Sequence, residues 1–269
     1  MAVAISNTAQ AVSSSSATGS RTWTGTSFGT AADDRLMVVS FCINTFGAAI
    51  PSLSCTIGGV AGTSLVSAHN SSSTTFIDYK IETFLALVPT GTSGTTVLSG
   101  TSIQALNAVA VFTRVTGADS TPSSTLGVTV DANKTISGSL TIPSNGAGLG
   151  VVGFTDSSTG YAWTNLTEAT DATAANLRVS SATSTSAGTS SRQAVVSTSE
   201  DAADVYQVMN LIAFQVPVTG QPAVKRMGSV PFVGNRRGQN TNLWREQLVG
   251  WRKSISGLLL PPKPSIMRI

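Results

Sequence analysis

Short runs of alternating hydrophobic and polar residues follow one another along the chain as far as Val216. Clusters of Gly, Pro, Asn and Ser bound these runs, and Phe76–Val88 alternates most clearly. Such runs are typical of β-strands, and no run before Gly220 has the spacing of an amphipathic helix. The pattern predicts strands at Thr22–Phe28, Leu36–Asn44, Thr63–Ala68, Phe76–Val88, Ala105–Val115, Thr125–Val130, Thr135–Ile142, Gly148–Thr155, Tyr161–Glu168, Leu177–Ser181, Ala194–Ser197 and Val205–Val216.

The succession of strands predicts an all-β fold. Short turns without crossover helices favour antiparallel pairing in a single, jelly-roll-like β-sandwich. Leu36–Asn44 is nearly continuous in apolar residues, as in a strand buried on both faces. The polar stretch Thr170–Ser191 predicts a largely exposed loop, and the glycine-rich segments 57–62 and 146–150 predict tight turns.

A boundary near residue 220 separates a body from a C-terminal arm. Val205–Val216 has the pattern of a closing core strand, and Pro217, Gly220 and Pro222 then end it. We therefore expect a β-sandwich body over 1–220, with 1–20 as an extended N-terminal segment, and an arm over 221–269. The arm contains one predicted short helix, at Thr241–Lys253.

The two parts differ in the sign of their charge. Residues 221–269 hold nine Lys or Arg and one acidic residue, whereas residues 1–220 hold seven Lys or Arg and twelve Asp or Glu. The formal charges are therefore +8 (9 − 1) and −5 (7 − 12), which sum to the +3 of the whole chain. A weakly acidic body with a basic extension indicates attachment to another molecule.

The arm interleaves apolar anchors with cations. Trp and Arg are enriched at interface hot spots, so this composition favours docking on an acidic protein surface. Phosphate neutralisation and base stacking by the same residues would instead suit nucleic acid, which stays open as a less favoured alternative. The predicted docking residues are Arg236, Arg237, Trp244, Arg245, Leu248, Trp251, Arg252 and Lys253.

The body offers little catalytic chemistry. His69 is the sole histidine, and its Ser/Asn-rich surroundings predict an exposed loop residue without a catalytic role. Cys42 and Cys55 are expected to be reduced, packed thiols, although a disulfide across neighbouring strands stays open. One histidine and two cysteines exclude a multi-histidine metal site and a zinc site made of these residues alone. We therefore expect a protein that is not an enzyme and that binds no cofactor or metal.

The N-terminus lacks a basic region and an apolar run of signal-peptide length. No segment approaches the roughly 20 consecutive apolar residues that a membrane-spanning helix needs. We therefore expect synthesis in a cytoplasm, without membrane association.

Three strand-and-turn phrases are Asp34–Phe41 (DRLMVVSF), Cys55–Gly62 (CTIGGVAG) and Ala86–Val97 (ALVPTGTSGTTV). They resemble β-sandwich domains of tailed-bacteriophage virion proteins, among them head decoration and tail-fibre components. The resemblance spans roughly residues 20–216 and does not extend to the arm. It implies a virion protein, made in the host cytoplasm, that forms symmetric oligomers, trimers above all.

These observations together predict a non-enzymatic virion structural protein: a capsid decoration, cement or fibre subunit. Its arm would dock on neighbouring capsid or tail subunits. The alternative is a carbohydrate-binding adhesin, a receptor-binding module of a phage tail. In that case Trp23, Tyr161 and Trp163 would stack on glycan rings, with Tyr161 and Trp163 on one face of a strand.

Overall fold

The computed structural model describes residues 2–13, 17–46, 50, 52–71, 77–100, 104–130, 135–155, 161–174, 177–185, 190–198 and 207–217. Every regular element in these ranges is a β-strand, and every strand pair is antiparallel. The predicted all-β class with antiparallel pairing is therefore confirmed. The chain divides into two units, Met1–Gly220 and Gln221–Ile269. The second unit, with its predicted helix, lies outside the described residues.

The strands of residues 4–116 form two sheets. Sheet A has the order β1-β10-β4-β8-β7, with β2 also paired to β10, and sheet B has the order β3-β9-β5-β6. The strands of sheet A are β1 (Ala4–Ser13), β2 (Ala17–Thr18), β4 (Leu36–Phe46), β7 (Thr63–Ser71), β8 (Ile77–Leu87) and β10 (Gln104–Thr116). Those of sheet B are β3 (Arg21–Ser27), β5 (Leu53–Ile57), β6 (Val60–Ala61) and β9 (Ser93–Gly100).

The strands of residues 124–214 form two more sheets. Sheet C has the order β11-β18-β13-β16-β15, and sheet D has the order β12-β17-β14. The strands of sheet C are β11 (Ser124–Val130), β13 (Ala147–Thr155), β15 (Thr167–Ala174), β16 (Leu177–Thr185) and β18 (Gln207–Phe214). Those of sheet D are β12 (Thr135–Ile142), β14 (Tyr161–Thr164) and β17 (Ser190–Thr198).

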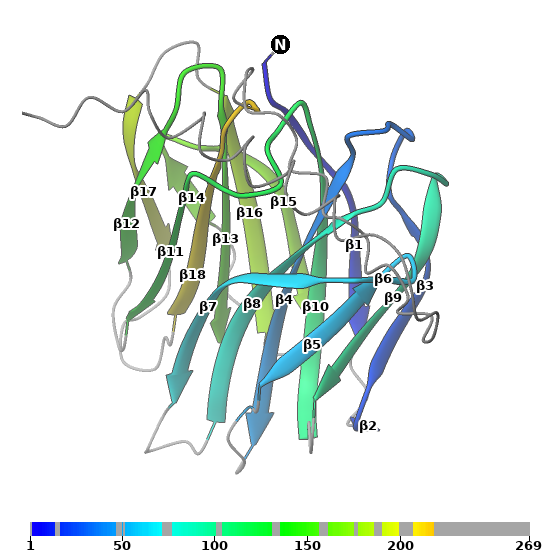
Figure 1. Cartoon of the computed structure of the whole chain (residues 1–269). Helices are drawn as coiled ribbons and strands as arrows, with labels where there is room; N and C mark the ends of the chain where they lie inside the picture. The colour runs from blue at the N-terminus through cyan, green and yellow to red at the C-terminus, as the bar shows by residue number, and fades with distance from the viewer. Residues whose placement is uncertain are drawn as a thin grey trace, which may run out of the picture. The chain divides into compact units, whose positions relative to one another are not determined.

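The four sheets are stacked in the order B, A, C, D, with a hydrophobic core between each neighbouring pair (Figure 1). The two middle sheets are apolar on both faces, and β18 is buried along its whole length. Strand β4 is likewise buried on both faces, as the apolar run Leu36–Asn44 predicts. The expected single sandwich is wrong: the described body consists of two sandwiches, A with B and C with D, packed face to face.

The two sandwiches share one strand order. If the two-residue β2 and β6 are set aside, each sandwich has eight strands. In each, the first, eighth, third, sixth and fifth strands form the middle sheet, and the second, seventh and fourth form the outer sheet. The contact between sheets A and C is reciprocal, because β1 lies against β15 and β11 lies against β7. Such reciprocity is the mark of a two-fold arrangement, here between the halves of one chain.

A short sequence repeat accompanies the structural one. Leu36–Phe41 of β4 is LMVVSF, and Leu149–Phe154 of β13 is LGVVGF. In both segments the Leu and the first Val face the core between sheets A and C, and the second Val and the Phe face the outer sheet of their own half. The match is therefore in burial as well as in residue type.

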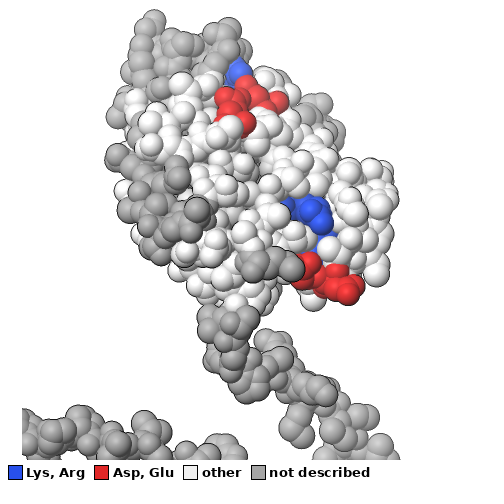
Figure 2. Space-filling model, turned by 90° about the horizontal axis from the view of Figure 1, so that it is seen from above, with Lys and Arg blue, Asp and Glu red and all other residues white. Residues whose placement is uncertain are grey.

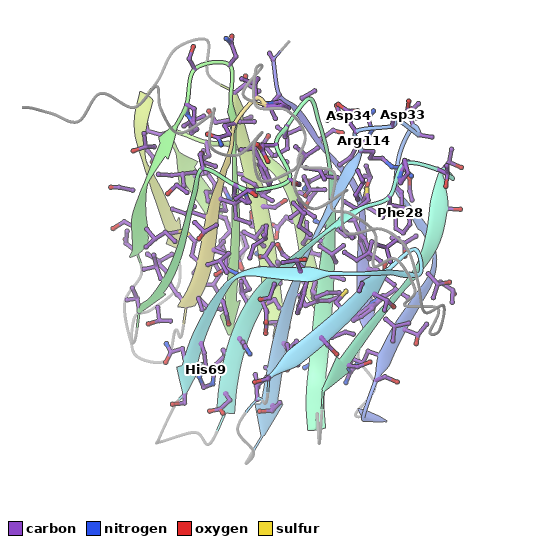
Figure 3. The ribbon with its side chains drawn as sticks, in the orientation of Figure 1. Phe28, Asp33, Asp34, His69 and Arg114 are labelled. Atoms are coloured by element: carbon purple, nitrogen blue, oxygen red, sulfur yellow. The ribbon has the colours of Figure 1, made fainter. Side chains whose placement is uncertain are left out.

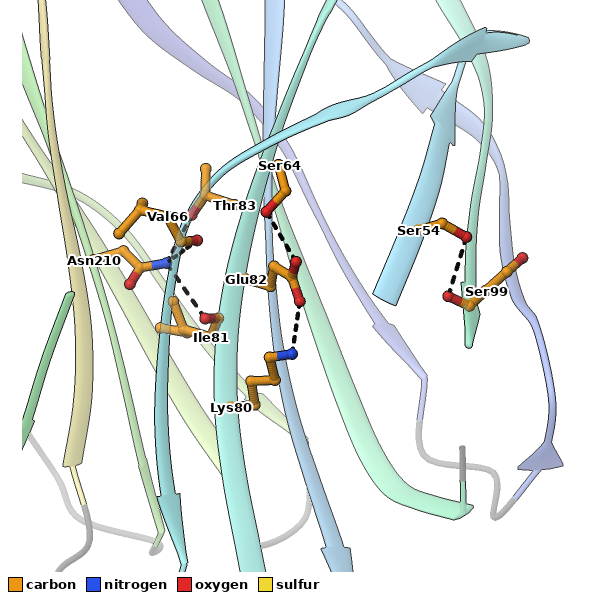
Figure 4. Close-up of polar contacts among 9 residues, drawn as sticks. All are labelled: Ser54, Ser64, Val66, Lys80, Ile81, Glu82, Thr83, Ser99 and Asn210. Atoms are coloured by element: carbon orange, nitrogen blue, oxygen red, sulfur yellow. Dashed lines mark hydrogen bonds and ion pairs between the residues drawn. The ribbon is translucent and has the colours of Figure 1, made fainter. Parts of the chain in front are cut away.

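A buried amide joins the two halves. The Asn210 side chain on β18 donates to the carbonyl oxygen of Val66 and to Thr83 Oγ1, both at 3.1 Å, and to the carbonyl oxygen of Ile81 at 3.4 Å (Figure 4). Asn210 is 1% exposed. Buried polar groups are stable only when they are hydrogen-bonded, so these contacts help to fix the register of sheet C on sheet A.

Three expectations about local structure are wrong. Residues 4–13 form β1 at the edge of sheet A and not a separate extended segment. The predicted loop at Thr170–Ser191 contains the end of β15, the start of β17 and all of β16, which extends the predicted strand Leu177–Ser181. Ser180 and Ser181 of β16 are fully buried and hydrogen-bond to Thr170 of β15. Gly148 and Gly150 belong to β13 and not to a turn. A Cβ atom at Gly148 would lie 2.7 Å from Ile142 of sheet D, so glycine permits the close packing of the two sheets.

Candidate functional site

The predicted docking residues all lie outside the described part of the chain. They are Arg236, Arg237, Trp244, Arg245, Leu248, Trp251, Arg252 and Lys253, and their role in docking stays a prediction.

The three aromatic residues of the adhesin hypothesis are not gathered at one surface. Trp23 is 6% exposed in the core between sheets A and B, with its ring centroid 5.2 Å from that of Phe41. Tyr161 and Trp163 belong to β14 of sheet D, so the two sites are separated by sheets A and C. This arrangement excludes a shared stacking platform.

Tyr161 and Trp163 pack on one face of β14, toward the core between sheets C and D. Tyr161 is 9% exposed, and its ring stacks on Phe154 with centroids 4.5 Å apart. The Trp163 indole nitrogen donates to Ser180 Oγ at 2.8 Å. Both rings therefore pack toward the core: Tyr161 is buried, and Trp163 is partly buried.

The Arg178 side chain of β16 packs over the Tyr161 ring. The Arg178 guanidinium carbon lies 4.7 Å from the ring centroid, and the same guanidinium is paired with the Asp171 carboxylate. Burial and the neighbouring Asp171 raise the pKa of Glu168 above its ordinary value, whereas the hydrogen bond from Arg178 to Asp171 raises the pKa of Arg178. Burial raises the pKa of Tyr161 strongly, so its hydroxyl stays protonated. These contacts join β14 of sheet D to β15 and β16 of sheet C, which indicates a structural role.

His69 lies within β7 and not in a loop, which corrects the sequence-based expectation. Its Nε2 is 3.5 Å from Asp78 Oδ2, and its side chain is 41% exposed. On the same two strands Glu82 accepts a hydrogen bond from Ser64 at 2.9 Å and pairs with Lys80 Nζ at 2.8 Å (Figure 4). Within the described ranges, no three His, Cys, Asp or Glu side chains are placed to hold a metal ion.

The two cysteines are free and lie in different cores. Cys42 of β4 lies in the core between sheets A and C, whereas Cys55 of β5 lies in the core between sheets A and B. The expectation of two reduced, packed thiols is confirmed. Burial raises the pKa of Cys55 to about 12 and raises the pKa of Cys42 strongly.

This burial predicts that neither thiol reacts with Ellman's reagent in the folded protein at pH 8. The thiolate is the reactive species, and both thiols are protonated and covered at that pH. At constant protein concentration, the absorbance should show that no thiol reacts within minutes in buffer. In guanidinium chloride it should show that two thiols per chain react. Rapid reaction in buffer would contradict the burial of Cys42 and Cys55.

A cleft opens at one end of sheet B. Its volume is about 470 Å³, and it lies among the β5–β6 turn, the connection from β8 to β9, and Phe28 after β3. None of its lining side chains is charged. The lining residues are Phe28, Gly58, Gly59, Val60, Val88, Pro89, Thr90, Gly91, Ser93, Gly94 and Thr95. We call this the glycine cleft.

At two positions of the glycine cleft, only glycine leaves enough space for the Phe28 ring. A Cβ atom at Gly94 would lie 2.4 Å from the Phe28 ring, and one at Gly58 would lie 3.0 Å from it. Phe28 is 1% exposed, so its ring forms the floor of the cleft. Val60, at 40% exposed, is one of two large apolar side chains exposed among the described residues. The cleft therefore offers apolar side chains and bare backbone to a ligand.

Arg35 holds the walls of the glycine cleft together. It is fully buried, and its guanidinium donates to the carbonyl oxygens of Val88 and Thr90, both at 2.6 Å. It also donates to the carbonyl oxygens of Gly29 at 3.1 Å and Phe28 at 3.4 Å. Burial, with a smaller contribution from Arg114, lowers its pKa from the ordinary value. One cation thus joins the connection from β8 to β9 to the segment after β3.

Two acidic side chains lie at the same end of the body as the cleft. Asp33 and Asp34 directly precede Arg35 and are both exposed. Asp34 Oδ2 accepts a hydrogen bond from the Gly117 amide at 2.6 Å, and Arg114 donates to the Thr30 carbonyl at 3.0 Å. Figure 3 shows Phe28, Asp33, Asp34 and Arg114 at the same end of the body, with His69 at the other end. The cleft therefore has an apolar floor, and the exposed pair Asp33 and Asp34 lies with Arg114 at the same end of the body.

Elsewhere the outer surfaces carry few charges. The exposed positions described on sheets B and D are hydroxyl-bearing, small or apolar residues, among them Thr22, Thr24, Ser54, Thr56, Thr95, Thr135, Ser137, Ser139 and Thr141. Figure 2 shows one face of the molecule, on which the described charged residues occur in two separate groups.

Comparison with known proteins does not name a family. No family model matches the chain, and no curated protein or solved structure matches it. A search of the described ranges for helices finds none that is long and apolar enough to cross a membrane.

Proposed function

We propose that this chain is a non-enzymatic structural subunit of a virus particle, of the capsid decoration, cement or fibre type. In this proposal the body forms the rigid part, and the arm from Gln221 joins it to neighbouring capsid or tail subunits. The observation that carries the proposal is the distribution of charge. On the outer sheets of the body, the described exposed positions are hydroxyl-bearing, small or apolar residues, whereas the arm combines nine cations with Trp244, Leu248 and Trp251.

The topology supports the proposal. The strand order that both halves share is, we propose, that of a jelly roll, so that the body contains two in tandem. Jelly rolls serve both in viral capsids and in lectins, and a fold alone does not identify a function. Two of the three aromatic residues of the adhesin alternative, Trp23 and Tyr161, are buried, which favours the other role. The capsid-like role is therefore the better supported of the two, and we propose a symmetric homo-oligomer, a trimer in the first instance.

Incorporation into particles tests this proposal. A chain that ends at Gly220 should remain folded, with the β-rich circular dichroism spectrum of the full chain, but it should no longer join particles. The Trp244→Ala/Trp251→Ala variant of the full chain should also join particles less well, because Trp anchors dominate protein interfaces. Ser139→Ala, on the exposed face of sheet D, is the matched control and should behave as the unaltered chain.

A further inference from the structure

We propose that the glycine cleft receives the arm of a second copy of this chain, with Trp251 in the cleft and Arg252–Lys253 beside Asp33 and Asp34. This inference rests on the proposed function, because it names the neighbour that the arm binds. It further implies that copies associate head to tail, since the arm and the cleft are different surfaces. A head-to-tail contact closes into a ring when the rotation between copies is suitable, as in a trimer.

The shape and chemistry of the cleft fit a flat aromatic anchor. The floor is the Phe28 ring, one wall is the exposed Val60 side chain, and Val88 and Pro89 add further apolar surface. Four of the eleven lining residues are glycines, so a planar ring can approach the backbone closely. A volume of about 470 Å³ leaves room for a large side chain. Trp is the residue most enriched in such interface pockets.

Charge complementarity favours the arm over other apolar segments as the occupant of the glycine cleft. The residues before the arm have a formal charge of −5 and the arm has +8, so each copy carries both partners of an attractive pair. Asp33 and Asp34 precede Arg35, which is bonded to the carbonyl oxygens of three cleft residues. In the arm, two cations follow Trp251 directly. An aromatic anchor followed by cations thus matches an apolar cleft that has two carboxylates at the same end of the body.

Cysteine cross-linking between full-length chains tests the inference. One chain carries Val60→Cys in the cleft, and the other carries Gly250→Cys beside Trp251. Cys42 and Cys55 are buried and stay unreactive, as the unaltered chain treated in parallel should show. After a short bis-maleimide reaction of the mixed chains, we expect a cross-linked heterodimer on a denaturing gel. Its yield should be at least ten times that obtained with Ser139→Cys in place of Val60→Cys.

Three further substitutions test the chemistry of the contact. Trp251→Ala in the arm-labelled chain should lower the yield several-fold, because the anchor is lost. Asp33→Lys in the cleft-labelled chain should also lower it, and Arg252→Glu in the arm-labelled chain should restore part of it. Equal yields from the cleft and from Ser139→Cys would overturn the inference. A chain that carries both Val60→Cys and Gly250→Cys is treated in the same way. If cross-linking occurs only within this chain and not between chains, the inference is overturned as well.

The outcome separates this inference from the proposed function. If removal of the arm abolishes incorporation and the cleft does not cross-link between copies, the function stands and the arm binds elsewhere. If the cleft cross-links between copies and the arm-deleted chain is incorporated normally, the arm joins copies to each other and the proposed attachment to the particle is wrong.

Discussion

Replacing Arg35 with Leu is expected to lower the free energy of unfolding by about 3–5 kcal/mol. The guanidinium donates to four backbone carbonyl oxygens, and Leu would leave these acceptors without their donor inside the protein. Burying carbonyl groups without hydrogen-bond donors is costly, and water cannot readily replace the lost donor at a fully buried position. Urea denaturation followed by circular dichroism measures the change.

Arg35→Lys and Arg114→Leu are the controls for this prediction. Lys keeps the charge but lacks the planar fork that reaches several carbonyl groups, so its loss of stability should be intermediate. Arg114 is half-buried and donates to the Thr30 carbonyl, so its replacement should cost about 1 kcal/mol or less. If Arg35→Leu were as stable as Arg114→Leu, Arg35 would not be the residue that holds the cleft together.

Gly153→Ala is expected to lower the free energy of unfolding by about 1–3 kcal/mol. Gly153 of β13 lies where sheet C meets sheet A, and a Cβ atom there would be 2.2 Å from Cys42 Sγ of β4. The added methyl group therefore forces the two sheets apart or displaces the thiol. Because β4 is buried on both faces, it has little room to move.

The double variant Cys42→Ala/Gly153→Ala tests the contact between the halves directly. Cys42→Ala removes the sulfur atom that the new methyl group meets, so the double variant should be more stable than the sum of the single effects predicts. Coupling between residues in contact is typically about 0.5–3 kcal/mol. Strict additivity in urea denaturation would contradict the face-to-face packing of sheets A and C at this position.

The sequence pattern identifies strands best where large apolar residues are dense. Leu36–Phe46 is an example, because its continuous apolar run reflects burial on both faces. Strand β9 escaped prediction because Ser, Thr and Gly fill six of its eight positions, and β5 escaped because it has only five residues, two of them Ser or Thr. The few large residues of these strands suffice to cover one face of sheet A. The end of β15 misled in the same way, since the Thr170 hydroxyl group is paired with that of Ser181.

The amino-acid sequence carries only a weak signal of the duplicated sandwich. The two halves share the LxVVxF phrase of β4 and β13, but burial can be satisfied by many apolar residues, so most other positions differ. The glycine cleft gives even less signal, because it is built from turn glycines and from backbone groups bonded to Arg35. Trp23 and Tyr161 show the converse problem: an aromatic residue suits a core as well as a binding surface.

The most direct test of the proposed role of the arm is a competition for incorporation into particles. The full chain and the chain ending at Gly220 are supplied in equal amounts, and their ratio in purified particles is measured by quantitative mass spectrometry with peptides from the shared body. Both chains must first show the same β-rich spectrum and one cooperative unfolding transition. The account predicts that the full chain exceeds the shortened chain at least ten-fold in the particles. An equal ratio would contradict it.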